Sequence, residues 1–169
     1  MKQSYLSRLL DFHLGPGNHP SGSSQDVHGD EGAGGSNIIR TEGASLEMGY
    51  GNMKEAFRIT HPSGAYVTGY AYGQDFPNDS FSKTRAELFK IEVPKDQRRK
   101  GLGSSLAVDS LRVMVDNGAL TVNMSPTNEG AKKFNLWLVD QGYISGPLRE
   151  SQSGKVEYKI EIDKVMKDR

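Results

Sequence analysis

Short stretches of alternating apolar and polar residues dominate the chain from residue 55 onward, and such alternation is typical of half-buried β-strands. Glu55 to Thr60 and Ala65 to Gly73 are two such stretches, and the His-Pro-Ser-Gly segment between them has the composition of a turn. This pattern predicts a β-hairpin. Further strands are predicted at Ala86 to Val93, Leu120 to Ser125 and Val156 to Ile162.

Two longer stretches place their apolar residues at the spacing of one helical face. They predict α-helices at Ser104 to Asp116 and at Asn128 to Asp140, which end at Asn117-Gly118 and near Gly142. The order is therefore strands, helix, strand, helix, strands. It predicts an α/β fold with a mixed sheet and at least one crossover connection.

The composition of the chain changes near Ser36. Residues 11–36 hold seven of the 20 glycines and three of the four histidines but few large apolar side chains. Burial there cannot offset an ordering entropy of about 1–2 kcal/mol per residue. We therefore expect a Gly/His-rich arm over residues 1–36, flexible or docked on a partner protein, ahead of a folded domain over residues 37–169. Within the arm, Met1 to Leu10 has the pattern of a short docking helix.

The charges and the missing cysteines exclude several functions. Twenty-one basic and 21 acidic residues leave no global field that would attract nucleic acid or an anionic membrane. Without cysteine the chain has no disulfide, thiolate nucleophile or Cys-type zinc site. His13, His19 and His28 are too irregularly spaced to predict a metal site. No apolar run approaches ~18 residues, so we expect a soluble, cytoplasmic protein.

The densest basic cluster, Arg98, Arg99 and Lys100, runs directly into Gly101-Leu102-Gly103 at the entrance of the first predicted helix. Glycines there let several main-chain N–H groups point to one place, and the helix dipole adds about half a positive charge. The stretch therefore predicts a pyrophosphate site, although a solvated turn would explain the same residues. It matches neither a Walker loop nor the dinucleotide fingerprint.

The segment LFKIEVPKDQRRKGLGSSLAVDSL resembles motif A of the GCN5-related N-acetyltransferase (GNAT) superfamily: a strand, Arg/Gln-x-x-Gly-x-Gly/Ala, then a helix. Arg98, Gly101 and Gly103 match that motif. SPTNEGAKKFNLWLVDQGY resembles the next block of the family, with matches at Asn128, Ala131, Gly142 and Tyr143. The resemblance covers residues 55–162. The arm also resembles Gly/His linkers ahead of enzyme domains in bacteriophage head-associated polyproteins, which suggests a phage origin and a virion-associated location.

The resemblance implies a GNAT-like fold: a mostly antiparallel sheet with a central splayed parallel pair and flanking helices. Its N-terminal helices would be reduced, because residues 37–54 leave room for one strand at most. The cofactor implied is acetyl-CoA. Its pantetheine would pair with the main chain of Ile91 and Val93, and Asn128 would bond the pantetheine, brace the second strand or cap its helix. The amides around the pyrophosphate would be those of Arg98, Arg99, Lys100, Gly101, Leu102, Gly103 and Ser104.

The resemblance does not extend to the general acid. Many family members have a tyrosine that acts as the general acid and protonates the departing thiolate. At that position this chain has Asn135. Tyr143 and Tyr158 are the possible substitutes, although Tyr143 matches a core aromatic position and Tyr158 lies on a predicted strand. Catalysis without a strong acid is also consistent with the sequence, because a thioester leaves easily and positioning supplies much of the acceleration.

Glu87 and Glu92, on the motif A strand, are the candidates for the general base that takes a proton from the attacking amine. They are five residues apart, so strict alternation predicts that they face opposite sides of the sheet. Glu87 would share a face with Phe89 and Ile91 and would have its pKa raised by partial burial. Glu92 would form a surface ion pair with Lys90. We therefore prefer Glu87.

Two functions remain open at this point. One is an N-acetyltransferase that moves acetyl from acetyl-CoA to an amine of a small molecule or protein by direct attack. The other is a GNAT-like module that no longer catalyses and binds a partner, in a phage particle or on a host protein. The glycine motif favours the first function. The lack of a clear general acid, the short segment before the hairpin and the Gly/His-rich arm favour the second.

Overall fold

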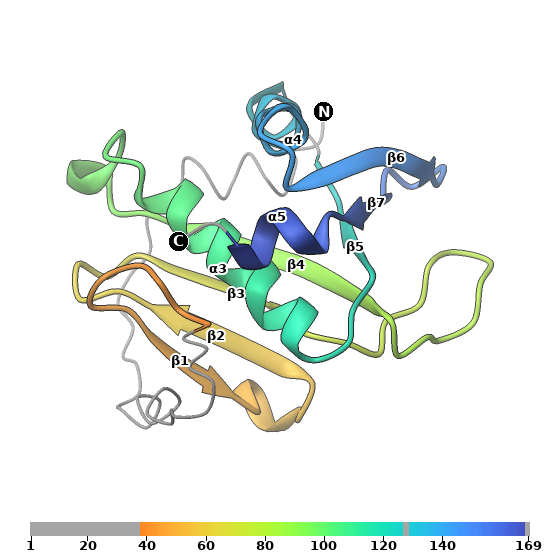
Figure 1. Cartoon of the computed structure of the whole chain (residues 1–169), viewed down its shortest axis with the longest axis horizontal. Coiled ribbons are helices and arrows are strands. Elements are labelled where there is room, and N and C mark those ends of the chain that lie inside the picture. The colour runs from red at the N-terminus through yellow and green to blue at the C-terminus, as the bar shows by residue number, and fades with distance from the viewer. Residues whose placement is uncertain (1–37, 127–128, 168–169) are drawn as a thin grey trace.

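The structure is a computed structural model that describes residues 38–126 and 129–167 of the chain. Seven strands form one sheet in the order β1-β2-β3-β4-β5-β7-β6 (Figure 1). The strands are β1 (Ser45–Met48), β2 (Ala56–Thr60), β3 (Tyr66–Tyr70), β4 (Arg85–Glu92), β5 (Thr121–Met124), β6 (Ile144–Glu150) and β7 (Val156–Ile160).

One pair of neighbouring strands in the sheet is parallel. β4 and β5 run in the same direction, and the other five pairs are antiparallel. The parallel pairing covers three residue pairs, from Arg85 opposite Thr121 to Glu87 opposite Asn123, whereas β4 continues to Glu92. The two strands thus separate beyond Glu87. The predicted mixed, mostly antiparallel sheet with a central splayed parallel pair is confirmed.

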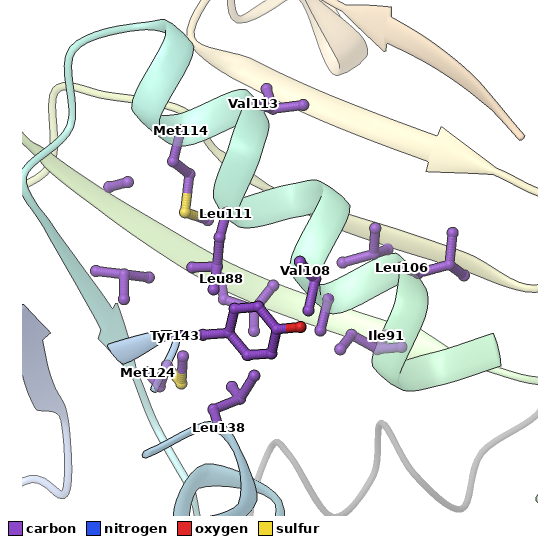
Figure 2. Packing of buried hydrophobic residues seen from close by; sticks show 14 of the residues in the cluster. Leu88, Ile91, Leu106, Val108, Leu111, Val113, Met114, Met124, Leu138 and Tyr143 are labelled. Carbon is purple, nitrogen blue, oxygen red and sulfur yellow. The ribbon is translucent and has the colours of Figure 1, made fainter. Parts of the chain in front are cut away.

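Within the described residues, three helices flank the sheet: α3 (Leu102–Asp116), α4 (Glu129–Asp140) and α5 (Ile162–Lys167). The core between helices and sheet includes Leu111 of α3, Leu138 of α4 and Met124 of β5 (Figure 2). α5 packs on α3, where the Arg112 Nε donates a 3.0 Å hydrogen bond to the Val165 carbonyl. The helices and the buried sheet face thus form one continuous core.

A β-bulge interrupts β4. Lys90 is opposite Thr68 and Leu88 is opposite Gly69, so Phe89 is an extra residue in the pairing with β3. An extra residue reverses the alternation of faces. Leu88 and Ile91 therefore both point into the helix-covered core, although they are three residues apart.

This bulge corrects the predicted orientation of the two candidate bases. Glu87 pairs with Tyr70 and Glu92 pairs with Tyr66, and Tyr66 and Tyr70 lie on one face of β3. Glu87 and Glu92 are therefore on the same face of the sheet, opposite to Ile91. Strict alternation was wrong here because it assumed that each residue of β4 has one partner.

Most predicted elements are found with shifted ends. The hairpin of β2 and β3 and both long helices are present, but β3 ends at Tyr70 and α3 begins at Leu102. β6 was not predicted, because Gly146-Pro147 disrupts its pattern; proline is tolerated there since β6 is an edge strand. The six-residue α5 was also missed.

Before the hairpin, residues 38–54 contain β1 and one 3-10 turn, η2 (Tyr50–Asn52). This agrees with the expectation that the segment has room for one strand at most. The arm over residues 1–36 and Asn128 lie outside the described residues. In the part of the chain that is described, no helix is both long enough and apolar enough to cross a membrane.

Candidate active site

The bend between β4 and α3 turns the chain through two left-handed residues. Arg99 has a φ of 65° and Gly101 a φ of 80°, directly before the first helical residue, Leu102. Glycine adopts this conformation at little cost, whereas arginine does so rarely. Alternating conformations of this kind form a concave row of amides, which is a common anion-binding geometry.

Six consecutive main-chain N–H groups, from Arg99 to Ser104, donate no hydrogen bond within the described residues. The N–H of Ser105 is the first to join the helix, through a 3.0 Å bond to the Gly101 carbonyl. On the other side, the Arg98 N–H lies 3.4 Å from the Lys95 carbonyl. The amides that the sequence assigned to a pyrophosphate are thus available from Arg99 onward.

A cavity of about 370 Å³ opens beside this bend. Its wall includes the bend, Val93 at the end of β4 and Phe134 on α4. A Cβ added to Gly103 would lie 3.5 Å from a Val93 methyl, which is an ordinary contact. Packing inside the fold therefore does not require glycine at 103, whereas a ligand that approaches the main chain closely would.

The three cations of the bend differ in their surroundings. The Arg98 Nε donates a 2.9 Å hydrogen bond to the Val93 carbonyl, so this side chain folds back onto the end of β4. Arg99 and Lys100 are exposed. We infer that Arg98 helps to fix the shape of the bend, while Arg99 and Lys100 place positive charge at its mouth.

The main chain of Ile91 faces the gap between β4 and β5. Hydrogen-bonded pairs alternate along antiparallel strands, and the His61 N–H donates to the Ala65 carbonyl at 2.8 Å. Val67, two residues further along β3, therefore bonds β2 through its main chain. Its partner on β4, Ile91, directs its N–H and C=O away from β3. The motif A resemblance implies that Ile91 pairs with pantetheine through its main chain, and this orientation would allow that pairing.

Glu87 lies where the parallel strands separate. Its register partners are Tyr70 on β3 and Asn123 on β5, and Lys155 Nζ is 3.6 Å from its Oε1. Burial raises the pKa of Glu87, although Lys155 opposes the shift and Asp75 adds slightly to it. The raised pKa agrees with the predicted direction, and the role of Glu87 as a base stays a prediction.

Glu92, the other candidate base, forms the predicted ion pair with Lys90, with Nζ 2.8 Å from Oε2. The pair is not a surface pair, however, because the Glu92 side chain is only 1% exposed. The extra residue at 89 places Glu92 on the same face as Tyr66, whose pKa is raised by burial and by the nearby Glu92 carboxylate.

Tyr143 is a core residue. Its ring packs near Trp137, with centroids 6.1 Å apart, and Lys164 Nζ lies 5.2 Å from the ring centroid. Figure 2 shows the ring among Leu138 and Val108, on the helix-covered side of the sheet. Glu87 is on the opposite face, so the fold does not bring the two catalytic candidates together. The role of Tyr143 as an acid stays a prediction.

The other tyrosine considered as an acid, Tyr158, is 7% exposed, and its hydroxyl accepts a 3.3 Å hydrogen bond from Asn135 Nδ2. Burial raises its pKa. Tyr158 pairs with Val122, which places it on the helix-covered face with Tyr143. Neither substitute is therefore beside Glu87.

A network of ion pairs that the sequence did not predict lies at the end of the sheet where β4 and β5 are hydrogen-bonded to each other. The carboxylate of Glu157 on β7 accepts hydrogen bonds from Arg85 Nε at 3.0 Å, Arg149 Nε at 2.6 Å and Thr121 Oγ1 at 2.7 Å. The two arginines also reach Asp79 in the loop before β4. The network thus links four strands next to Glu87.

Replacing Glu157 with Gln is expected to lower the free energy of unfolding by about 3 kcal/mol, because two guanidinium groups lose a shared buried carboxylate. Burial pushes the pKa of Glu157 up, but its three hydrogen bonds outweigh burial and leave the pKa below 4.5. The stabilisation is thus present above pH 4.5 and is lost as the pH falls through the lower folded pKa. Urea unfolding of both proteins at several pH values measures the difference in their free energies of unfolding.

The exposed Glu150→Gln provides the matched control for that substitution, since it removes one acidic charge from the neighbouring strand β6 without breaking the network. Its unfolding free energy is expected to stay within about 0.5 kcal/mol of the unmodified protein. Equal losses in the two variants would show that the Glu157 network does not stabilise the fold.

Comparison with known proteins finds no matching family model and no matching curated protein. Among solved structures, the PaiA N-acetyltransferase from Thermoplasma acidophilum in complex with coenzyme A is 10% identical, with 62% of this chain and 58% of that one covered and a TM-score of 0.41. The YhbS GNAT family N-acetyltransferase from Escherichia coli in complex with CoA is 15% identical, with 65% and 61% covered at 0.41. The chain thus spans less than two thirds of these two proteins. The GNAT domain of S. lividans PAT is 17% identical, with 92% and 76% covered at 0.40.

Proposed function

We propose that this protein is an acetyl-CoA-dependent N-acetyltransferase of the GNAT superfamily. The observation that carries the proposal is the row of six amides from Arg99 to Ser104, which lack acceptors within the described residues, at a glycine-containing bend before a helix. Any helix leaves its first N–H groups without an intrahelical acceptor, but here the amides of Arg99, Lys100 and Gly101 extend that row into a left-handed bend, which is an anion-binding geometry. The motif A resemblance covers the same residues.

The residues around the gap fit the coenzyme. The bend and its cavity would hold the diphosphate, with Arg99 and Lys100 as countercharges, and Ile91 presents main-chain groups to the gap where pantetheine would lie. The bound coenzyme would supply an acetyl group activated as a thioester. The proposed contact between Asn128 and the coenzyme rests on the sequence resemblance alone.

Glu87 would take the proton from an incoming ammonium group, which converts the acceptor into a nucleophile. Its burial and raised pKa suit a base that operates near neutral pH. The acceptor is an amine of a small molecule or of a protein. A phage origin, a cytoplasmic or virion-associated location and partner docking through residues 1–36 rest on the sequence alone.

Isothermal titration calorimetry with acetyl-CoA tests the proposal. We expect one site with a dissociation constant in the micromolar range that weakens with added salt, because charges at the bend contribute to binding. Release of free thiol in the presence of an amine would then show turnover. Absence of binding at millimolar coenzyme would refute the proposal and leave the non-catalytic binding module.

A further inference from the structure

A second cavity, of about 280 Å³, lies on the face of the sheet opposite to α3. It extends from η2 across β3 to the bulge in β4, and most of its wall is aromatic or apolar. The lining residues that matter here are Tyr50, Met53, Tyr66, Tyr70, Phe89 and Lys90. The volume suits a ligand about the size of one amino acid.

The aromatic wall of this cavity is held in place by contacts behind it. The Arg58 guanidinium lies 3.9 Å from the centroid of the Tyr66 ring, and its Nη1 donates a 2.9 Å hydrogen bond to the Tyr50 hydroxyl. Tyr70 and Phe89 contact each other with ring centroids 6.4 Å apart. The rings are thus positioned before any ligand arrives, which lowers the entropic cost of binding.

The charges next to the aromatic wall disfavour a polycation. Arg58 lies opposite Glu47 on β1, and Lys90 pairs with Glu92. Among the described residues that line the cavity, Lys90 is charged and none is acidic, so the rings offer no carboxylate to a second ammonium group.

One end of the cavity is different. Tyr70 lies directly opposite Glu87, and Glu87 lies opposite Asn123 across the parallel pair. Asn123 is fully buried, and its Oδ1 accepts no hydrogen bond within the described residues. The partly exposed Glu87 carboxylate thus lies just beyond the aromatic wall, with Lys155 Nζ 3.6 Å from its Oε1, so this site already accommodates one ammonium group.

We propose that the acceptor is a small monoamine with a compact aromatic or branched aliphatic body, which lies on the wall formed by Tyr70 and Phe89 while its ammonium group meets the Glu87 carboxylate in place of Lys155. This inference rests on the proposed function. In the reaction, the amine nitrogen forms the new C–N bond with the acetyl carbonyl as the C–S bond of the thioester breaks. One ammonium proton goes to Glu87 and then to solvent, and a second proton from the nitrogen ends on the sulfur.

The test compares amines after coenzyme binding has been measured by calorimetry. We expect kcat/KM for 2-phenylethylamine to exceed that for 1,4-diaminobutane by roughly 100-fold, which corresponds to about 2.7 kcal/mol. Phe89→Ala is expected to raise KM for 2-phenylethylamine about tenfold and to leave KM for acetyl-CoA unchanged. Phe81→Ala, at a 62% exposed phenylalanine in the loop before β4, is the matched control and should change neither.

The outcomes separate the two proposals. If acetyl-CoA does not bind, the proposed function fails and this inference fails with it. If acetyl-CoA binds but the diamine is the better acceptor, only the acceptor class is wrong. An unchanged KM for 2-phenylethylamine in both Phe89→Ala and Tyr70→Ala, with circular dichroism showing that both fold, would likewise overturn the assignment of the cavity.

Discussion

Gly103→Glu is expected to raise the dissociation constant for acetyl-CoA roughly 100-fold or more, which is a loss of about 2.7 kcal/mol of binding free energy. Position 103 is in the first turn of α3, and a side chain there projects toward Val93 and Ile91 at the end of β4. A glutamate would thus place a negative charge and a side chain of several heavy atoms between the bend and the gap, where the diphosphate is proposed to bind. Calorimetry with the purified variant measures the effect.

Two variants show whether that loss reflects the ligand or the fold. Gly103→Ala adds a Cβ that fits at 3.5 Å from Val93 and is expected to stabilise the helix by up to about 1 kcal/mol while weakening the coenzyme. Gln152→Glu adds the same charge on an exposed turn and should leave binding unchanged. If Gly103→Glu folds and binds acetyl-CoA as tightly as the unmodified protein, the bend does not hold the coenzyme.

The bend could be predicted because its signals are local. Pro94 ends a strand, Gly101 permits a left-handed turn, and the apolar stripe from Leu106 begins the helix, all within a short stretch of sequence. Each signal acts through the conformation of its own residue or its helical neighbours. The turn between β2 and β3 and the end of α3 near Gly118 could be predicted for the same reason, because their signals are also local.

The orientation of Glu87 and Glu92 could not be predicted, because it depends on how two strands pair. An extra residue at Phe89 leaves no glycine or proline signal in the sequence, yet it moves every following side chain of β4 to the other face. The face of the sheet on which Glu87 lies, next to the aromatic cavity, thus depends on the register with β3, which alternation within one strand does not reveal.

Long-range contacts were missed for a related reason. The Glu157 network joins arginines on β4 and β6 to a carboxylate on β7, and β6 is itself an unpredicted strand. Similarly, the aromatic cavity gathers Tyr50, Tyr70 and Phe89 from three segments that are far apart in the sequence. Only the three-dimensional arrangement shows that Glu87 lies between that cavity and the coenzyme gap.

Glu87→Gln is expected to lower kcat about 100- to 1000-fold, because the amide cannot accept the ammonium proton. Burial raises the Glu87 pKa above 4.5, and a base works only when ionised, so kcat/KM of the unmodified protein should rise with pH through that raised value. The variant should lack this rise, while its affinity for acetyl-CoA stays the same. Rates of thiol release between pH 5 and pH 9 provide the measurement.

Lys155→Met and Glu92→Gln distinguish a catalytic base from a carboxylate that merely supports the fold. Lys155 lies 3.6 Å from Glu87 and opposes the upward shift of its pKa, so its removal should move the rise in kcat/KM to higher pH and preserve the rate at the plateau. Glu92→Gln makes the same chemical change on the same face of β4 and should keep the pH dependence, because Glu92 is paired with Lys90. If the rise disappears in Glu92→Gln and persists in Glu87→Gln, then Glu92 is the base, and the bulge would have placed it on the acceptor face in place of Glu87.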